Sequence, residues 1–275
     1  MTGGVRAASF AVDGGEVEAD IAGEGAAGAP ILFLHGWTLD RRMWAPQMSV
    51  LSARHPVIAL DRRGFGRSTA PASLDQEPED IVAILDALSV GACVIVGMSQ
   101  AGRVALDFTR RYPARVAALV LQGAQIEGVV PVSEPVEEIP VPAYRELVRM
   151  GEIARMREQW RAHPLMYMPN AAARRAVSEI LEDYDGRDLL APPSKPLAAG
   201  AEALAQVVAP ILVITGDEET AHRRRIADAI AETGRSATRV VIKNAGHLCN
   251  LCDASAYNTA VEDFLSKRHL STAQR

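Results

Sequence analysis

The chain has 275 residues, of which 48% are hydrophobic and 23% charged, and its formal net charge at pH 7 is −5. This composition is typical of a globular protein with one or two domains. The acidic balance argues against a nucleic-acid partner, and the longest apolar runs are far shorter than the roughly 18 residues that a membrane span needs.

The first twenty residues, "MTGGVRAASFAVDGGEVEAD", do not resemble a signal peptide, because Asp13, Glu16 and Glu18 interrupt any apolar core. We therefore expect a cytoplasmic protein that acts on a small molecule, with neither nucleic acid nor membrane as a partner. The oligomeric state stays open, with a homodimer as one alternative.

Short apolar runs bounded by turn residues follow one another along the chain. After the strand patterns "ASFAV" and "VEADIAG" come "PILFLHG", "PVIALD", "ACVIVG" and "VAALVLQG". A helical pattern begins near Pro78, and a second extends from Gln100 to Tyr112, where Pro113 ends it. This alternation predicts a mostly parallel sheet with helices on both faces.

The alternation stops near Gly123 and returns with "PILVITG", "HRRRIADAIAET", "TRVVIK" and "SAYNTAVEDFLSK". Between these parts, "AYRELVRMGEIARMREQW" and "NAAARRAVSEILEDY" are each predicted to form an amphipathic helix, after a Pro- and Glu-rich connector, "GVVPVSEPVEEIPVP". An insertion of this size is too long for a loop. We predict a core of residues 1–124 and 207–275, with residues 125–206 forming a helical cap over the edge of the sheet.

Ser99 lies in "VGMSQAG", between a predicted strand and a predicted helix. The stretch nearly matches G-x-S-x-G, with Ala101 in place of the second glycine. That pattern places a nucleophilic serine on a strained turn, although a serine that only caps the helix is the alternative. His247, in "NAGHLCN", is the candidate base, and the loop "VITGDEET" offers Asp217, Glu218 and Glu219 as candidate acids, of which one must be chosen.

An oxyanion hole requires two backbone N–H groups near the nucleophile. The residue after the serine, Gln100, offers one of them. The turn "FLHGWTLD" offers the other at Trp37, because Gly36 allows a sharp bend there, although a tight turn with a packed tryptophan explains the same residues.

These stretches, together with "VIALDRRGFGRSTAP", resemble the α/β-hydrolase family, and within it the small esterase, non-haem haloperoxidase and enol-lactonase branch. The resemblance implies a mostly parallel eight-stranded sheet, a helical cap, a Ser99–His247–Glu219 triad, and Trp37 and Gln100 as oxyanion donors. It implies hydrolysis of a small carboxylic ester or lactone without metal, haem or other cofactor. It also implies that "DRRGFGRS" is a structural turn.

Several alternatives remain at this stage. Some relatives take the acid from the loop after the preceding strand, which makes Glu127, in "GAQIEG", a rival to Glu219. A small-molecule receptor or pseudoenzyme, an acyltransferase and a carbon–carbon bond hydrolase can share these motifs. Cys249 and Cys252 form C-x-x-C without further ligands, which predicts two half-buried cysteines on a helical turn and makes zinc or redox use the weaker reading.

The predicted cap contains apolar side chains that suit a lid, at Trp160, Met166, Tyr167 and Met168, although core packing explains such residues equally well. It also carries five arginines. We expect most of them to pair with nearby glutamates on a solvated face, and one of them to bind a substrate carboxylate as the alternative. These are Arg145, Arg149, Arg155, Arg157 and Arg161.

Overall fold

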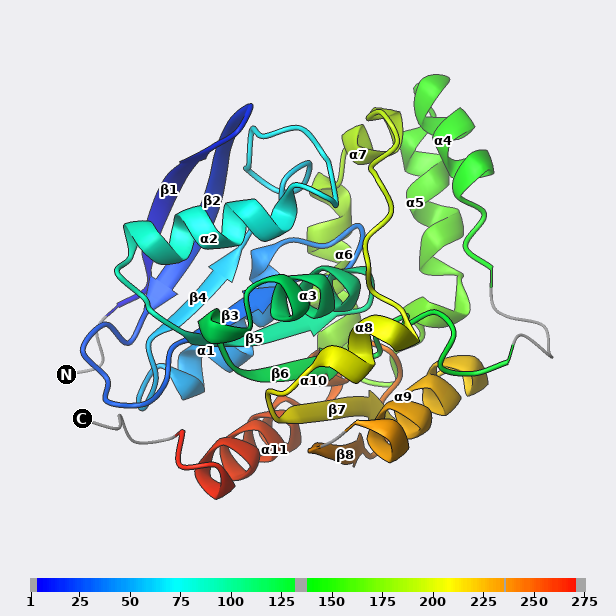
Figure 1. The fold of residues 1–275 in the computed structure, drawn as a ribbon. Helices are drawn as coiled ribbons and strands as arrows, with labels where there is room; N and C mark the ends of the chain where they lie inside the picture. Colours follow the sequence, from blue (N-terminus) through cyan, green and yellow to red (C-terminus); the bar gives the residue numbers. More distant parts are fainter. Residues whose placement is uncertain (1–3, 132–137, 235, 271–275) are drawn as a thin grey trace.

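The computed structural model describes residues 4–131, 138–234 and 236–270. Its centre is an eight-stranded sheet in the order β1-β2-β4-β3-β5-β6-β7-β8 (Figure 1). The strands are β1 (Arg6–Val12), β2 (Gly15–Ala22), β3 (Ile31–Leu34), β4 (Val57–Leu60), β5 (Cys93–Met98), β6 (Val116–Gln122), β7 (Ile211–Gly216) and β8 (Ala237–Ile242). β1 and β2 are antiparallel to their neighbours, and the other pairs are parallel. The prediction of a mostly parallel sheet is confirmed.

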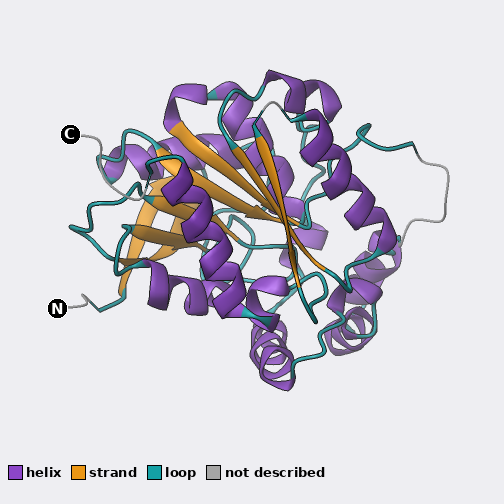
Figure 2. Cartoon of the chain, turned by 90° about the horizontal axis from the view of Figure 1, so that it is seen from below, coloured by secondary structure: helices purple, strands orange, loops and turns teal. Residues whose placement is uncertain are grey.

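Helices cover both faces of the sheet (Figure 2). On one face lie α1 (Ala45–Leu51), the short α10 (Cys249–Cys252) and α11 (Ala254–Lys267). On the other lie α2 (Glu77–Ala87), α3 (Gln100–Arg111), α8 (Ala201–Gln206) and α9 (Ala221–Thr233). Strands β3, β4, β5 and β7 are buried along their whole length, as expected when helices pack on both sides.

The chain between β6 and β7 carries further helices that stand beside the sheet rather than on its faces (Figure 1). They are α4 (Val141–Arg149), α5 (Ile153–Arg161), α6 (Ala171–Asp183) and α7 (Arg187–Leu190). The expectation of one helix over "AYRELVRMGEIARMREQW" was wrong. Gly151, with φ of +77°, ends the first helix, and the chain turns before the second begins.

The insertion leaves and rejoins the core at neighbouring points. Glu127 and Gly200 form a parallel bridge, and the N–H of Ala201 donates to the carbonyl of Glu127 across 2.9 Å. Part of the predicted connector, residues 132–137, lies outside the described residues. Within the described ranges, no helix is long and apolar enough to cross a membrane.

Two buried ion pairs fix the turn after β4. Arg62 binds Glu77 at 2.8 Å, and Arg63 binds Asp80 at 2.6 Å, so both guanidinium groups are held by α2. Burial raises the pKa of Glu77 and of Asp80, and the facing arginines oppose that rise. Separating the turn from α2 would leave these buried charges unpaired, which is costly. The two ion pairs therefore hold the turn against α2. The stretch "DRRGFGRS" thus has extensive structural contacts.

Candidate active site

Ser99 lies at the junction of β5 and α3 with φ of 54° and ψ of −115°, a conformation that residues with a side chain rarely adopt. Its side chain makes no capping hydrogen bond to α3, although the residue occupies the capping position. Its N–H donates instead to the carbonyl of Gln122 on β6, across 2.8 Å. The reading of Ser99 as an ordinary cap is therefore disfavoured, because a helix cap needs neither this strain nor this orientation.

Small residues make this turn possible. A Cβ on Gly97 would lie 2.6 Å from the carbonyl oxygen of Ala101, and a Cβ on Gly102 would lie 2.4 Å from the Cβ of Ala124. Ala101, where the pattern expects glycine, is completely buried. The helix thus packs closely on the strands behind the serine, and the methyl group of Ala101 fits there.

His247 is paired with Glu219. The imidazole Nδ1 and the carboxylate Oε2 are 2.5 Å apart, and both side chains are almost fully buried. Burial alone would raise the pKa of Glu219, but the charge and hydrogen bond of His247 outweigh it and bring that pKa below its ordinary value. An ionised Glu219 can only accept a hydrogen bond, so Nδ1 of His247 carries the proton. The lone pair of Nε2 then lies on the opposite side of the imidazole ring.

The Nε2 atom of His247 is buried and has no hydrogen-bond partner among the described residues. His247 lines a small apolar pocket that Ser99 also lines. A buried imidazole nitrogen with an available lone pair, beside a hydroxyl, is the arrangement that general-base activation of a serine requires.

The loops that carry Glu219 and His247 are bound to each other. The N–H of Ala245 donates to the Asp217 carboxylate across 3.3 Å, and the N–H of Glu218 donates to the carbonyl of Ala245 across 2.9 Å. A Cβ on Gly216 would lie 1.8 Å from that same carbonyl oxygen, so the two loops approach closely only because this residue is glycine. Asp217 therefore holds the loops together while Glu219 contacts the histidine.

Glu127, the rival acid, lies elsewhere. Its side chain is 70% exposed and forms an ion pair with Arg103 at 3.4 Å. The structure brings Glu219 to His247, whereas Glu127 lines a cavity beside Ser99 and is not paired with the histidine.

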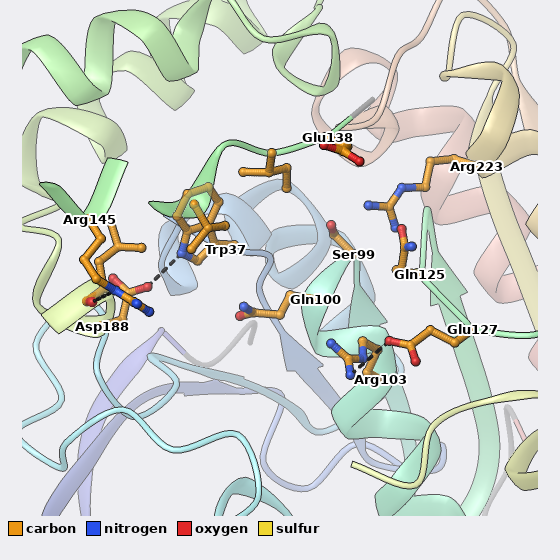
Figure 3. A pocket seen from close by; sticks show the side chains of 13 residues that line it. Trp37, Ser99, Gln100, Arg103, Gln125, Glu127, Glu138, Arg145, Asp188 and Arg223 are labelled. Atoms are coloured by element: carbon orange, nitrogen blue, oxygen red, sulfur yellow. Dashed lines mark hydrogen bonds and ion pairs between the residues drawn. The ribbon is translucent and has the colours of Figure 1, made fainter. Parts of the chain in front are cut away.

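Trp37 and Gln100 both lie beside Ser99 in the same cavity (Figure 3). The Gly36 turn passes very near the serine, since a Cβ on Gly36 would lie 3.6 Å from that of Ser99. Among the described residues, the backbone N–H groups of Trp37 and Gln100 have no hydrogen-bond acceptor. Both amides are therefore available to a ligand oxygen.

His35 controls the orientation of the peptide that contains the Trp37 amide. Its Nε2 accepts from the N–H of Arg62 at 3.0 Å, so Nδ1 must carry the proton that is donated to the carbonyl of Gly36 at 2.7 Å. Because a trans peptide directs its N–H opposite to its C=O, this bond turns the Trp37 N–H away from His35. Burial and the charge of Arg62 lower the pKa of His35 well below its ordinary value, which keeps the ring neutral.

Two cavities of different character meet at Ser99. The smaller, about 20 Å³, is apolar and includes Trp160, Leu165 and Met166 from the insertion. The larger, about 510 Å³, is lined by polar and charged side chains, with Arg145 and Asp188 at one end and Arg103 with Glu127 at the other (Figure 3). The site can therefore hold a small apolar group on one side of the serine and a larger polar group on the other.

Of the five arginines singled out in the insertion, Arg145 lines the larger cavity. Its Nε donates to the carbonyl of Leu189 at 2.8 Å. Arg149 and Arg155 pair with glutamates three residues earlier, as predicted, and Arg157 binds the carbonyl of Tyr184. The apolar side chains that the sequence suggested for a lid lie in different places. Trp160 and Met166 line the apolar pocket, whereas Tyr167 is 51% exposed.

Cys249 and Cys252 lie on α10, as predicted, but both are buried rather than half-buried. Burial raises the pKa of both thiols, which disfavours the reactive thiolate. Within residues 4–131, 138–234 and 236–270, no group of three or more His, Cys, Asp or Glu side chains could hold a metal ion.

Sequence reasoning missed three residues that shape the site, namely His35, Gly123 and Asp188. His35 and Gly123 each follow a buried strand directly, a position that could have indicated them. Asp188 lies in the insertion and contacts Trp37, which is 151 positions away in the sequence, and no local pattern indicates such a pairing.

Known proteins resemble this chain in sequence and in fold. A sequence model of the alpha/beta hydrolase family matches residues 31–260. The 2-hydroxymuconate semialdehyde hydrolase of Pseudomonas sp. strain CF600 is 28% identical over 263 residues, covering 88% of each chain.

Two solved structures are similar over nearly the whole chain. A thermophilic esterase from Thermogutta terrifontis has a TM-score of 0.74 and 25% identity, covering 97% of this chain and all of that one. An enol-lactonase from Burkholderia xenovorans has a TM-score of 0.77 and 23% identity, covering 94% of this chain and all of that one. The second likeness shows the fold alone.

Proposed function

Because the chain belongs to the alpha/beta hydrolase family and is a hydrolase, we propose that it cleaves a small carboxylic ester or lactone through a Ser99–His247–Glu219 triad. The observation that carries the proposal is the buried His247–Glu219 pair, whose free Nε2 shares a pocket with Ser99. The likeness to an esterase over the whole chain supports the same reaction class.

In the proposed reaction, Oγ of Ser99 attacks the carbonyl carbon while Nε2 of His247 takes the hydroxyl proton. The negative charge that forms on the carbonyl oxygen is held by the N–H groups of Trp37 and Gln100, each worth about 3 kcal/mol in the transition state. The imidazolium then gives its proton to the leaving alkoxide, and an acyl group remains on Ser99. Water, deprotonated by the same imidazole, releases the acid and restores the serine.

We propose that residues 125–206 act as a cap and contribute to substrate choice. Trp160, Leu165 and Met166 close the apolar pocket, which suits a short hydrocarbon group. The larger polar cavity suits the other side of the ester. The expected substrate thus carries a small apolar group on one side of the carbonyl and a polar group on the other.

The test is labelling of the purified protein with a fluorophosphonate probe, read by peptide mass spectrometry, together with hydrolysis of 4-nitrophenyl acetate. We expect label on Ser99 in the wild type and its loss in Ser99→Ala and His247→Ala. Ser49→Ala and His269→Asn, which alter an exposed serine and an exposed histidine, are the matched controls. Unchanged turnover in Ser99→Ala would refute the proposal.

A carbon–carbon bond hydrolase with the same triad is the second candidate, favoured by the semialdehyde hydrolase among the relatives. Labelling of Ser99 without hydrolysis of activated esters would support this candidate. Tight binding of a small molecule without labelling would instead support a receptor on the same fold.

A further inference from the structure

Asp188, on α7, binds two aromatic side chains at once. Its Oδ2 accepts from the indole N–H of Trp37 at 2.7 Å, and its Oδ1 accepts from the hydroxyl of Tyr184 at 2.6 Å. Both bonds are short; burial raises the pKa of Asp188, and the hydrogen bonds from Tyr184 and Trp37 oppose that rise. The carboxylate is therefore fixed between the insertion and the turn that carries Trp37.

The Trp37 indole is also packed tightly by rings from the insertion. The ring of Trp160 lies 4.9 Å away edge-on, and the rings of Tyr144 and Tyr184 lie 6.2 and 6.3 Å away. Van der Waals packing alone permits small rotations of such a ring, whereas a hydrogen bond to Nε1 sets its direction. Asp188 thus determines how the side chain of Trp37 is oriented within this aromatic cluster.

The turn that carries Trp37 is strained. The next residue, Thr38, has φ of 64°, which is unusual for a β-branched residue, and its hydroxyl accepts from the indole of Trp160 at 2.7 Å. A strained turn keeps its conformation only when surrounding contacts enforce it. On the core side His35 holds the Gly36 carbonyl, and on the insertion side Asp188 holds the Trp37 ring.

We propose that Asp188 is a positioning residue that directs the Trp37 amide at the reacting oxygen and thereby makes catalysis depend on the placement of the insertion. This inference rests on the proposed function, because it assigns the Trp37 N–H to the oxyanion hole. Asp188 acts through Trp37 and takes no part in proton transfer. Its location at the end of the cavity opposite Arg103 agrees with a supporting role (Figure 3).

Asp188→Asn is the test, since the amide keeps the shape of the carboxylate but cannot accept from both donors. We expect kcat for 4-nitrophenyl acetate to fall about 10- to 100-fold and KM to change less than about threefold, because an oxyanion donor acts mainly in the transition state. The affinity for phenylboronic acid, whose tetrahedral adduct places an oxygen in the same hole, should fall by a similar factor.

Arg187→Ala is the matched control. Arg187 precedes Asp188 on α7 and also connects the insertion to the core, through the carbonyls of Gly66 and Ser68, but it does not contact Trp37. Its loss should leave kcat within about twofold of the wild type. If Arg187→Ala lowers kcat as much as Asp188→Asn does, the effect is general docking of the insertion, and the inference is wrong.

Trp37→Phe keeps the backbone amide and an aromatic side chain, although a smaller one, and removes the indole N–H, so it should reproduce the fall in kcat. The double variant with Asp188→Asn should be no slower than either single variant, because both remove the same bond. Additive losses, or wild-type kcat in Asp188→Asn, would overturn the inference. An inactive and unlabelled wild type would instead refute the proposed function, and the role of Asp188 with it.

Discussion

Gly123 and His247 are in such close contact that no side chain fits between them. A Cβ on Gly123 would lie 2.7 Å from Nδ1 of the imidazole and 2.9 Å from Oε2 of Glu219. Gly123 also has φ of +52°, a backbone conformation that glycine adopts without the strain a side chain would cause. The residue that follows β6 therefore forms one wall of the histidine–glutamate pair.

Gly123→Ala should disturb this pair, whereas Gly151→Ala should not. Both glycines have positive φ, so backbone strain should lower the free energy of unfolding by about 1–2 kcal/mol in each variant, and in Gly123→Ala the steric clash adds to this loss. A Cβ on Gly151 meets nothing within 4 Å. We expect kcat to fall at least about tenfold for Gly123→Ala alone, because small displacements of catalytic groups are costly. Equal kcat in the two variants would contradict this account.

Glu219→Gln should reduce kcat far more than Glu127→Gln. The amide can present its N–H to the histidine and so stabilise the wrong tautomer, for which a loss of about 10³- to 10⁴-fold is expected. Glu127, which is exposed and paired with Arg103, should be replaceable with kcat within about twofold. Steady-state kinetics on both variants measures the two values of kcat. A larger loss of kcat in Glu127→Gln than in Glu219→Gln would make Glu127 the acid.

His35→Gln should change how stability depends on pH. In the folded protein burial and Arg62 depress the pKa of His35, so below the ordinary value near 6.5 the unfolded chain binds a proton that the folded one does not. The free energy of unfolding of the wild type should therefore decline with falling pH by up to about 1.4 kcal/mol per unit more than that of the variant. Urea unfolding at about pH 7 and pH 5.5 measures both slopes, and parallel slopes would show that folding does not depress the pKa of His35.

Arg145→Ala should discriminate between acidic and neutral substrates. Arg145 lines the polar cavity and is held through Nε, which leaves the guanidinium amino groups to meet a carboxylate. We expect KM for an ester with a terminal carboxylate to rise at least about fivefold, and KM for the matching neutral ester to change less than twofold. Arg149→Ala, which alters an exposed arginine paired with Glu146, is the control. An equal effect on both esters would show that Arg145 does not recognise charge.

Much of the fold could be predicted because its signals are local. Each strand of the parallel part is a short apolar run bounded by turn residues, and each helix on the sheet repeats its apolar positions at helical spacing. The alternation of the two predicts the layers directly. The same reasoning located Ser99, Glu219 and His247, since each follows a strand at the same edge of the sheet.

The supporting contacts could not be predicted, because polar pairs between distant segments have no periodicity. Nothing near Trp37 indicates that Asp188 accepts its indole N–H, and nothing near Arg62 indicates that Glu77 holds it. The division of α4 from α5 at Gly151 was missed for a related reason. The apolar spacing continues across the turn, so periodicity alone does not reveal the glycine's positive φ.

The bridge between Glu127 and Gly200 has a consequence for how such a protein can be remodelled. A segment whose two ends are neighbours can be excised, exchanged or grafted without moving any strand of the sheet. Loop-closure entropy changes slowly with length, so a shorter or longer replacement would cost the scaffold little. Under the proposed cap function, recombination between related genes at these two positions would transfer substrate preference as one unit, provided that the new segment again packs against Trp37.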